Sequence, residues 1–397
     1  MANVSSSNGL EKYPKLRFKG FSEPYRIVPL GDVACEVSRT DPTSKAPVMM
    51  LSAGNGFIMQ SEKYSRDNAG QSLKKYTLLK KGELAYNHGA SKAKQFGCCY
   101  QLEVDEALVP FVYHCFSVNK EYAPYISTVL NISTTERQLK KLVSSSVRMD
   151  GLLNISYDDY MTVELALPSM DEQQKVSCFL SLLEEKIKKQ QKLVEHLKKY
   201  KRGFLQASFS SQDDWNTYPI SSLGKVVTGS TPPTDNHENY GGNKLFCAPS
   251  DVGTEKYISS TIKRVSEKGF HTGRIVPKGT IIVTCIGLIG KLGIAMQDMI
   301  TNQQINSLIV DDAFDNEFIY YALEFALPRY AAQASMQTMP ILSKSEFEKI
   351  ALQIPNIKRQ KEISKPLALL DDKIFAESEI LEKLTTLKNG LLQNLFI

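Results

Sequence analysis

Apolar residues recur at alternating steps of three and four along two long stretches of the chain, 171–206 and the last forty residues. This period of 3.5 residues is typical of helices that pack as a coiled coil. We expect one long helix in each stretch, and residues 171–206 would span about 54 Å at ~1.5 Å per residue. Pro366 lies inside the second stretch and predicts a kink or a later start there. We call the line of positions along which each helix would face its partner the seam. The seam positions are Leu180, Leu183, Ile187, Gln190, Val194 and Leu197 in the first helix and Leu367, Leu370, Ile374, Glu377, Leu381 and Leu384 in the second.

The two helical stretches are copies of one segment. Residues 165–209 align with 352–396 without a gap, at a constant offset of 187, and 16 of the 45 positions are identical. The segments before them correspond more faintly, as KKGELAYN (80–87) does to PKGTIIVT (277–284). An internal repeat of this length indicates a duplicated unit. We therefore divide the chain into a tail (1–19), a first domain (20–167), a first helix (168–210), a second domain (211–354) and a second helix (355–397).

The start of each helix carries a capping signal directly after a proline. Ser169 and Glu172 follow Pro168 with the spacing of a capping box. In the second copy Asn356 follows Pro355 and predicts a simpler cap.

Each helix has a bare apolar seam, and the nearest partner for it is the other copy. Residues 183–202 carry eight Lys or Arg against three Glu, whereas 370–388 carry three Lys against five Asp or Glu, so the flanks are complementary. The second domain follows the first helix and precedes the second, which only an antiparallel pair allows without a long return crossing. We expect Gln190 and Glu377, at equivalent positions, to meet near a pseudo-two-fold axis as one polar layer.

A second apolar column lies beside the seam, at Leu193, Tyr200, Ile380 and Leu387. An apolar stripe this wide covers more than one neighbour. Either the two domains fill it, or it is a docking surface for helices of another protein.

The two domains combine short strands, turns and helices. IIVTCIGLIG (281–290) and NSLIV (306–310) indicate strands, and 315–333 and 121–141 indicate helices. TGSTPPT (228–234) and YGGN (240–243) indicate loops. The predicted fold class is α+β: two similar α/β domains separated by an antiparallel two-helix coiled coil with pseudo-two-fold symmetry.

Composition and motifs point away from catalysis. The net charge of +5 permits a nucleic-acid partner without requiring one. Seven cysteines without a C-x-x-C motif, and a polar start, favour reduced thiols and a cytoplasmic protein that does not enter a membrane. No nucleophile elbow, phosphate loop or dinucleotide fingerprint occurs. His114 beside Cys115 reads more readily as a core pair than as a site. The adjacent acidic pairs, Asp371 and Asp372 among them, read as solvated faces or caps. We expect a binding scaffold without catalytic residues, bound metal or cofactor.

Basic and amide side chains in the domains are candidates for DNA contacts, although each alone is more readily explained as an ordinary solvated surface residue. Lys and Arg neutralise phosphates, whereas Arg, Asn and Gln can read base edges. The candidates are Arg66, Lys74, Lys75, Lys92, Lys94 and Gln95 in the first domain and Lys244, Lys263, Arg264, Lys268, Arg274 and Lys291 in the second.

From about Lys15 to Ile397 the chain resembles the specificity subunit of type I restriction–modification enzymes. The resemblance is carried by the repeated helix and by several short motifs. These are Leu-Gly at 30–31 and 223–224, TGSTPPT, IGLIGKLG (286–293) and TNQQIN (301–306). Phe246 departs from the family, which often has Trp there. The first domain lacks a clear counterpart of TGSTPPT.

This resemblance implies two target-recognition domains, each reading one half of a split, asymmetric sequence in double-stranded DNA. The helices would be the spacer and the docking site for two methyltransferase subunits, with Leu193, Tyr200, Ile380 and Leu387 as candidate docking residues. Those subunits would bind S-adenosylmethionine and methylate adenine N6, and motor-nuclease subunits would join for cleavage. The alternatives are a non-catalytic scaffold with two protein- or carbohydrate-binding modules on a coiled-coil stalk, or a stand-alone hydrolase or methyltransferase.

Overall fold

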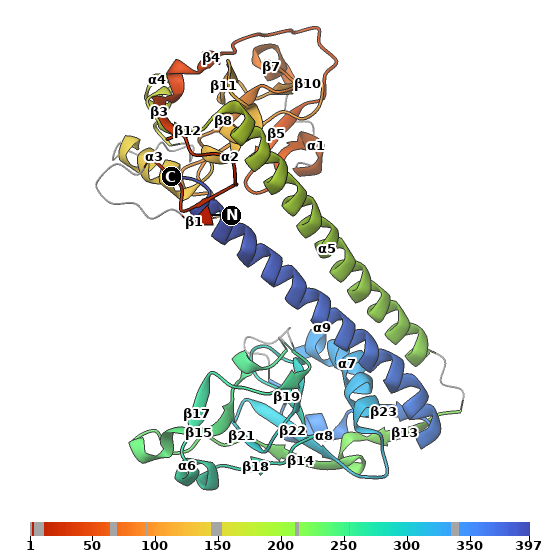
Figure 1. The fold of residues 1–397 in the computed structure, drawn as a ribbon. Helices are drawn as coiled ribbons and strands as arrows, with labels where there is room; N and C mark the ends of the chain where they lie inside the picture. Colours follow the sequence, from red (N-terminus) through yellow and green to blue (C-terminus); the bar gives the residue numbers. More distant parts are fainter. Residues whose placement is uncertain are drawn as a thin grey trace. The chain divides into compact units, whose positions relative to one another are not determined.

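The computed structural model describes residues 2–3, 12–63, 70–92, 94–143, 153–210, 214–253, 255–334 and 341–397 (Figure 1). The chain forms two compact units: unit 1 comprises residues 1–188 and 382–397, and unit 2 comprises 189–381. The helix α5 (Met170–Ser210) runs from one strand-rich domain into the next, and α9 (Ile357–Asn394) begins in unit 2 and ends in unit 1. The two long helices predicted from the apolar period are confirmed.

The strand-rich part of unit 1 is built from short elements. These are β1 (Ala2–Asn3), β2 (Leu16–Arg17), β3 (Arg26–Pro29), β4 (Ala34–Glu36), β5 (Met49–Ser52), β6 (Gly56–Met59), α1 (Gln60–Lys63), β7 (Thr77–Lys80), β8 (Leu84–Asn87), β9 (Cys98–Gln101), β10 (Glu106–Val109), β11 (His114–Val118), α2 (Ala123–Val129), α3 (Ser133–Leu142), α4 (Tyr157–Met161) and β12 (Glu164–Leu167). Its core packs side chains of β5, β7 and β10 with those of the β4-β11-β8-β9 sheet, and Leu79, Ala85 and Val109 are fully buried.

Unit 2 has its own core and a longer set of strands. Its elements are β13 (Asn216–Pro219), β14 (Gly224–Thr228), β15 (Tyr240–Cys247), β16 (Tyr257–Ile258), β17 (Lys263–Val265), α6 (Glu267–Thr272), β18 (Ile275–Val276), β19 (Ile281–Thr284), β20 (Leu292–Ala295), β21 (Met299–Thr301), β22 (Ile305–Val310), α7 (Asn316–Ala334), α8 (Lys344–Lys349) and β23 (Ala351–Ile354). The core joins these strands to α5 and α9 through Phe209 and Leu367, which are buried.

Both units share one frame. The sheet order β4-β11-β8-β9 in unit 1 matches β14-β22-β19-β20 in unit 2, to which β16 adds a fifth strand. Leu165 of β12 pairs with Val28, and Leu352 of β23, 187 positions later, pairs with Tyr218. The faint sequence correspondence between the two domains therefore reflects a shared arrangement of strands.

The register of the frame shows which segment of the first domain stands in the place of TGSTPPT, although its sequence is no clear counterpart. Ala34 pairs with Val118 in β11, as Gly224 pairs with Val310 in β22. Residues 38–44 therefore follow β4 as TGSTPPT follows β14. The sequences differ because Arg39 stands in place of the second residue, a glycine, and its guanidinium binds Glu83 at 2.7 Å.

The inserted segments differ between the units, as expected. Unit 2 carries a second sheet in the order β17-β15-β21-β18, whereas the corresponding region of unit 1 holds the pairs β5–β6 and β7–β10. The prediction of a loop at YGGN was wrong, because these residues open β15. The pairing of β15 with β17 shifts register between Tyr240 and Lys244, and Gly241 has φ +83°. The glycines therefore permit a bulge within a strand rather than a loop.

The helix pair is antiparallel within each unit. In unit 2, Gln190 Nε2 donates to the Glu377 carboxylate at 2.7 Å, and further along α5 Lys201 binds Asp371 at 2.7 Å. The residue number therefore rises in α5 while it falls in α9. The seam positions of α5 except Gln190 and Leu197 are buried, as is Leu367, and the other α9 positions are half-buried.

Repeated contacts attach each helix to its own domain. Gln173 Oε1 accepts from the amide of Tyr122 at 3.0 Å and its Nε2 donates to the Pro168 carbonyl at 3.0 Å. Gln360, 187 positions later, accepts from the Asp315 amide at 2.8 Å and donates to the Pro355 carbonyl at 2.9 Å. Each glutamine thus satisfies an exposed backbone donor at the start of the neighbouring helix, α2 or α7.

The predicted capping box at the start of α5 is only half formed. Ser169 Oγ accepts from the Glu172 amide at 3.4 Å, but the Glu172 carboxylate does not return to the cap. Arg17 binds it instead, through Nε at 2.9 Å and Nη2 at 2.7 Å, and the Tyr25 hydroxyl adds a third bond. The Arg17 and Glu172 side chains are only 4% and 1% exposed. Leaving a buried guanidinium without a carboxylate costs more free energy than leaving a helix end without its cap, so Arg17 takes the Glu172 carboxylate.

The start of α9 follows the sequence more closely. Asn356 Oδ1 accepts from the Arg359 amide at 3.0 Å, which confirms the predicted cap. A later start at Pro366 is wrong, because α9 begins at Ile357 and contains Pro366. In the part of the chain that the structure describes, no helix has the length and apolar character needed to cross a membrane.

Replacing Glu172 by Ala is expected to lower the free energy of unfolding of unit 1 by about 3–5 kcal/mol, because it leaves the Arg17 charge buried and unpaired. Urea denaturation followed by tyrosine fluorescence measures the loss. The matched control is Glu184→Ala, which removes an exposed ion pair with Lys388 and should cost under ~1 kcal/mol. Equal losses in the two variants would contradict this account of the Arg17–Glu172 pair.

Candidate nucleic-acid interface

Two of the sequence motifs of unit 2 lie against each other. The Gly229 amide donates to the Ile305 carbonyl at 3.0 Å and the Ser230 amide to the Thr301 carbonyl at 2.8 Å. At the surface, Thr231 Oγ1 donates to Gln303 Oε1 at 2.6 Å. We call this surface, residues 228–234 with 301–304, the loop platform.

Gly229 is what lets the two segments approach. A Cβ on this residue would lie 2.1 Å from the Asn302 carbonyl oxygen and 2.4 Å from that of Thr301. No side chain fits there without moving backbone, so glycine is required by the close approach.

Further hydrogen bonds hold the platform from its other side. The Tyr240 hydroxyl donates to the Pro232 carbonyl at 2.7 Å, and Asn239 Nδ2 donates to the Pro233 carbonyl at 3.0 Å. Pro232 is buried, while Thr231 and Gln303 are exposed. The platform is thus a fixed backbone that presents polar side chains to solvent.

Arg274, a predicted DNA contact, lies at the edge of the platform. Its amide donates to Ser230 Oγ at 3.0 Å, and Nη1 donates to the Thr228 carbonyl at 2.9 Å. The residue is exposed, and no ion pair joins it to a carboxylate among the described residues.

The other candidates of unit 2 fall into two groups. Lys263 and Arg264 are exposed on β17. Lys244 binds Glu267 at 3.2 Å and lies over the Phe270 ring, and Lys268 binds Glu238, whose pKa it lowers. Lys291 is half-buried. A lysine whose charge is already balanced by a carboxylate of the domain attracts a phosphate less strongly.

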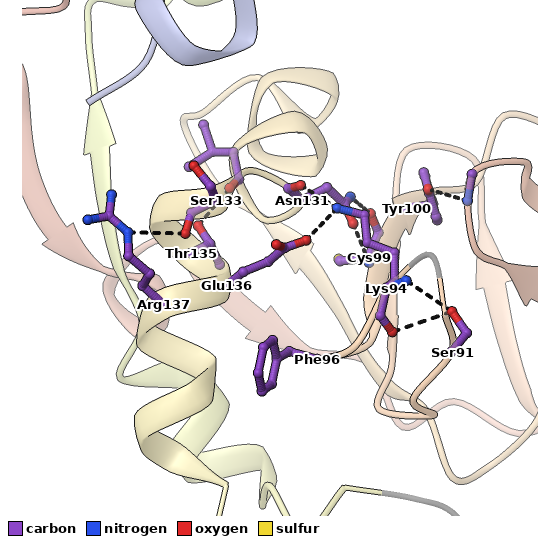
Figure 2. Close-up of polar contacts among 12 residues, drawn as sticks. Ser91, Lys94, Phe96, Cys99, Tyr100, Asn131, Ser133, Thr135, Glu136 and Arg137 are labelled. Atoms are coloured by element: carbon purple, nitrogen blue, oxygen red, sulfur yellow. Dashed lines mark hydrogen bonds and ion pairs between the residues drawn. The ribbon is translucent and has the colours of Figure 1, made fainter. Parts of the chain in front are cut away.

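In unit 1 the candidates are similarly divided. Lys74, Lys75, Lys92 and Gln95 are exposed, and Arg66 lies outside the described residues. Figure 2 shows Lys94 directed at Asn131 and Glu136; its Nζ lies 2.6 Å from the Asn131 carbonyl and 2.7 Å from Glu136 Oε1. Lys94 therefore ties its turn to the residues around α3, and its charge is balanced within the domain.

His114, which stood out in the sequence beside Cys115, packs among the core residues of unit 1. His114 packs beside the rings of Tyr86 and Tyr160, and burial lowers the pKa of its imidazole. Burial also raises the pKa of the Cys115 thiol to about 12. Within the described ranges, no group of three or more His, Cys, Asp or Glu could hold a metal ion.

Sequence reasoning missed a half-buried polar cluster where α5, α7 and α9 meet in unit 2. Asp371, predicted to be solvated, accepts from Tyr321 at 2.6 Å and from Lys201 at 2.7 Å. Lys201 also binds Glu324 at 2.9 Å, and burial raises the pKa of Glu324. The same two positions of the repeat also form an ion pair in unit 1, between Glu184 and Lys388. The opposite charges at these repeated positions were the signal in the sequence.

The apolar column beside the seam is exposed in both helices. The exposed fractions are 39% for Leu193, 61% for Tyr200, 43% for Ile380 and 52% for Leu387. The domains therefore leave much of this column open to solvent, which favours the alternative of a docking surface. Each helix has one further exposed member, Leu182 in α5 and Leu369 in α9, again 187 apart. Steps of 11 and 18 residues return to one face of an α-helix, so each helix carries the same column.

Known proteins match the chain in sequence and fold. Residues 212–386 match the family model for the type I restriction modification DNA specificity domain. The chain is 32% identical over 193 residues to the Type I restriction enzyme MjaIX specificity subunit of Methanocaldococcus jannaschii, covering 46% of this chain and 44% of that protein. It is 30% identical over 186 residues to the HindI specificity subunit of Haemophilus influenzae, covering 46% of this chain and 40% of that protein.

Each of these two sequence matches thus spans less than half of the relative's length. The fold match extends further. The crystal structure of a type I restriction-modification system S subunit from M. genitalium has a TM-score of 0.67 and 15% identity, covering 97% of this chain and 99% of that one.

Replacing Gly229 by Ala is expected to destabilise unit 2 by about 1–3 kcal/mol, because the added methyl group forces two backbone segments apart. Hydrogen exchange should accelerate at the amides of Gly229 and Ser230. The control Gly203→Ala lies on α5 with open space around it and should leave that exchange unchanged. Unchanged exchange in the Gly229 variant would show that the platform does not depend on this approach.

Proposed function

We propose that this chain, which belongs to the family of type I restriction–modification specificity subunits, is the non-catalytic DNA-recognition subunit of such a complex. Each strand-rich domain would read one half of a bipartite, asymmetric site. The observation that carries this proposal is one repeated frame with two different surfaces. The frame recurs strand for strand, whereas the segments inserted into it share neither sequence nor sheet order.

The loop platform is the part of unit 2 best suited to read bases. It presents Arg274, Gln303 and Thr231 on a fixed backbone. Lys263 and Arg264, which stand unpaired among the described residues, would neutralise phosphates. A surface with both kinds of contact can position itself on DNA and read a sequence.

The antiparallel helices would set the gap between the two half-sites. A direct repeat folded as an antiparallel pair relates its two copies by an approximate two-fold axis, which suits the opposed strands of DNA. The 41 residues of α5 span about 61 Å, which is long enough to serve contacts one duplex turn apart, about 34–36 Å.

The exposed apolar columns would dock two methyltransferase subunits. Each column consists of three large side chains at equivalent positions, Leu182, Leu193 and Tyr200 in α5 and Leu369, Ile380 and Leu387 in α9. Exposed apolar surface of this extent marks a protein interface, and its duplication suits two copies of one partner. These partners would bind S-adenosylmethionine and methylate adenine N6, with motor-nuclease subunits joining for cleavage. This chain would bind no cofactor, and the complex would act in the cytoplasm.

Lengthening both helices by one heptad next to Gln190 and next to Glu377 is expected to lengthen the gap and leave both half-sites unchanged. A heptad adds ~10.5 Å, so the change is at most about three base pairs. Single-molecule methylome sequencing of cells that express the chain with its methyltransferase measures the gap. The control inserts one heptad in α5 alone, which breaks the pairing and should abolish methylation. An unaltered gap in the matched variant would refute the spacer role.

Glutamate at Tyr200 or at Leu387 is expected to remove one methyltransferase subunit each, and the double variant should remove both. A charge buried in an apolar interface costs several kcal/mol, on the order of 2–5. Native mass spectrometry of the purified complex counts the subunits. Lys198→Glu, on the opposite side of α5, is the control and should keep two. Retention of both subunits by the double variant would favour a different docking surface.

A further inference from the structure

We propose that Arg274 is a base-reading residue of the second domain and that it recognises a guanine in the major groove. This inference rests on the proposed DNA-recognition function and assigns one residue within it. It arises from how Arg274 is held, which distinguishes it from every other exposed basic residue predicted to contact DNA in unit 2.

The backbone and the side chain of Arg274 are both fixed to the loop platform. Its amide donates to Ser230 Oγ at 3.0 Å, and Nη1 donates to the Thr228 carbonyl at 2.9 Å. A long side chain loses rotamer freedom when it binds, so a guanidinium that is already held pays less of this cost. The backbones of Lys263 and Arg264 pair within β17, but their side chains make no hydrogen bond or ion pair among the described contacts, so they suit phosphate neutralisation.

The platform beneath Arg274 is itself held by backbone contacts. The Ser230 amide donates to the Thr301 carbonyl at 2.8 Å, and the Tyr240 hydroxyl donates to Pro232 on the other side. Thr228, whose carbonyl receives the guanidinium, binds Asn306 through its hydroxyl at 2.7 Å. The position of Arg274 is therefore set by the same contacts that make the two motifs of this domain meet.

The donors that remain on Arg274 match guanine. One guanidinium hydrogen bond goes to Thr228, which leaves the Nε and Nη2 edge directed away from that contact. Guanine presents two acceptors, O6 and N7, in the major groove, and the fork of an arginine binds them together. No carboxylate pairs with Arg274 in the described part of the chain, so its charge is not already balanced.

Unit 1 does not repeat this device. In the segment equivalent to TGSTPPT, Arg39 stands at the glycine position, and its guanidinium is bound by Glu83 at 2.7 Å and by the Leu78 carbonyl at 3.1 Å. Its donors are used within the domain. In this segment of unit 1, therefore, no guanidinium is left free in the way that of Arg274 is.

The test uses the full chain with its methyltransferase, once wild-type methylation has defined a bipartite site. Arg274→Gln should change preference at a single position of one half-site, from guanine to adenine, because Gln binds adenine N6 and N7 as Arg binds guanine. Arg274→Lys should lower discrimination at that position by about ten- to a hundred-fold. The other half-site should keep its sequence. Methylome sequencing reads the sites, and competition with oligonucleotides changed at each position measures the discrimination.

The control is Arg264→Ala, which should weaken binding to all sequences alike and reduce its salt dependence. Hydrogen exchange at Ser230 shows whether each Arg274 variant keeps the platform. Weakening that is uniform over all sequences in a variant with an intact platform would overturn the proposal, and so would unchanged specificity. If both variants lose the platform, Arg274 is a structural support and the proposal is wrong. A wild-type complex that makes no bipartite mark would instead refute the proposed function.

Discussion

The structure depends on the antiparallel pairing of two copies of one helix. Three polar contacts define this pairing, and each obeys the spacing of the repeat. Glu184 with Lys388 and Lys201 with Asp371 are the same pair seen twice, 187 positions apart, and Gln190 meets its own equivalent, Glu377. A single charged or amide layer in an apolar seam costs stability but excludes other registers. Residues 184 and 201 lie about 25 Å apart along α5, so each can bind the equivalent of the other only if the two copies run in opposite directions.

The repeat separates what is shared from what varies. The shared part comprises the helix pair and the glutamines that bind the starts of α2 and α7. It also includes the sheet that contains β11 in unit 1 and β22 in unit 2. Variation lies in the segments between the strands. Even the shared ion pair differs in setting, because Lys201 and Asp371 join a half-buried cluster with Tyr321 and Glu324, whereas Lys388 and Glu184 are more exposed. A recognition protein needs this division, since a constant frame can present new surfaces without loss of the fold.

Sequence reasoning succeeded where one periodic signal determines the structure. The 3.5-residue period and the constant offset predicted both long helices, and the place of the second domain between them predicted their direction. Together they predicted the contact of Gln190 with Glu377. It failed where a residue has two possible partners and only the tertiary structure decides. Glu172 had the spacing of a capping box but binds Arg17, which is 155 positions away. Lys94 had the character of a phosphate contact but binds Glu136, and YGGN had the composition of a loop but forms a bulged strand. Arg274 is held at the edge of the platform by hydrogen bonds to Ser230 Oγ and to the Thr228 carbonyl, which no pattern of residues reveals.

The direction of the helix pair can be measured directly by cross-linking within one chain. Cysteines at Glu184 and Lys388, in a chain whose exposed Cys35 and Cys178 are replaced by serine, should be joined by a short bis-maleimide. Cysteines at Glu184 and Asp372, which a parallel pair in the repeat register would place side by side, should not be joined, because residue 372 lies about 24 Å along α9 from residue 388. Efficient cross-linking of 184 to 372, without cross-linking of 184 to 388, would contradict the antiparallel pair.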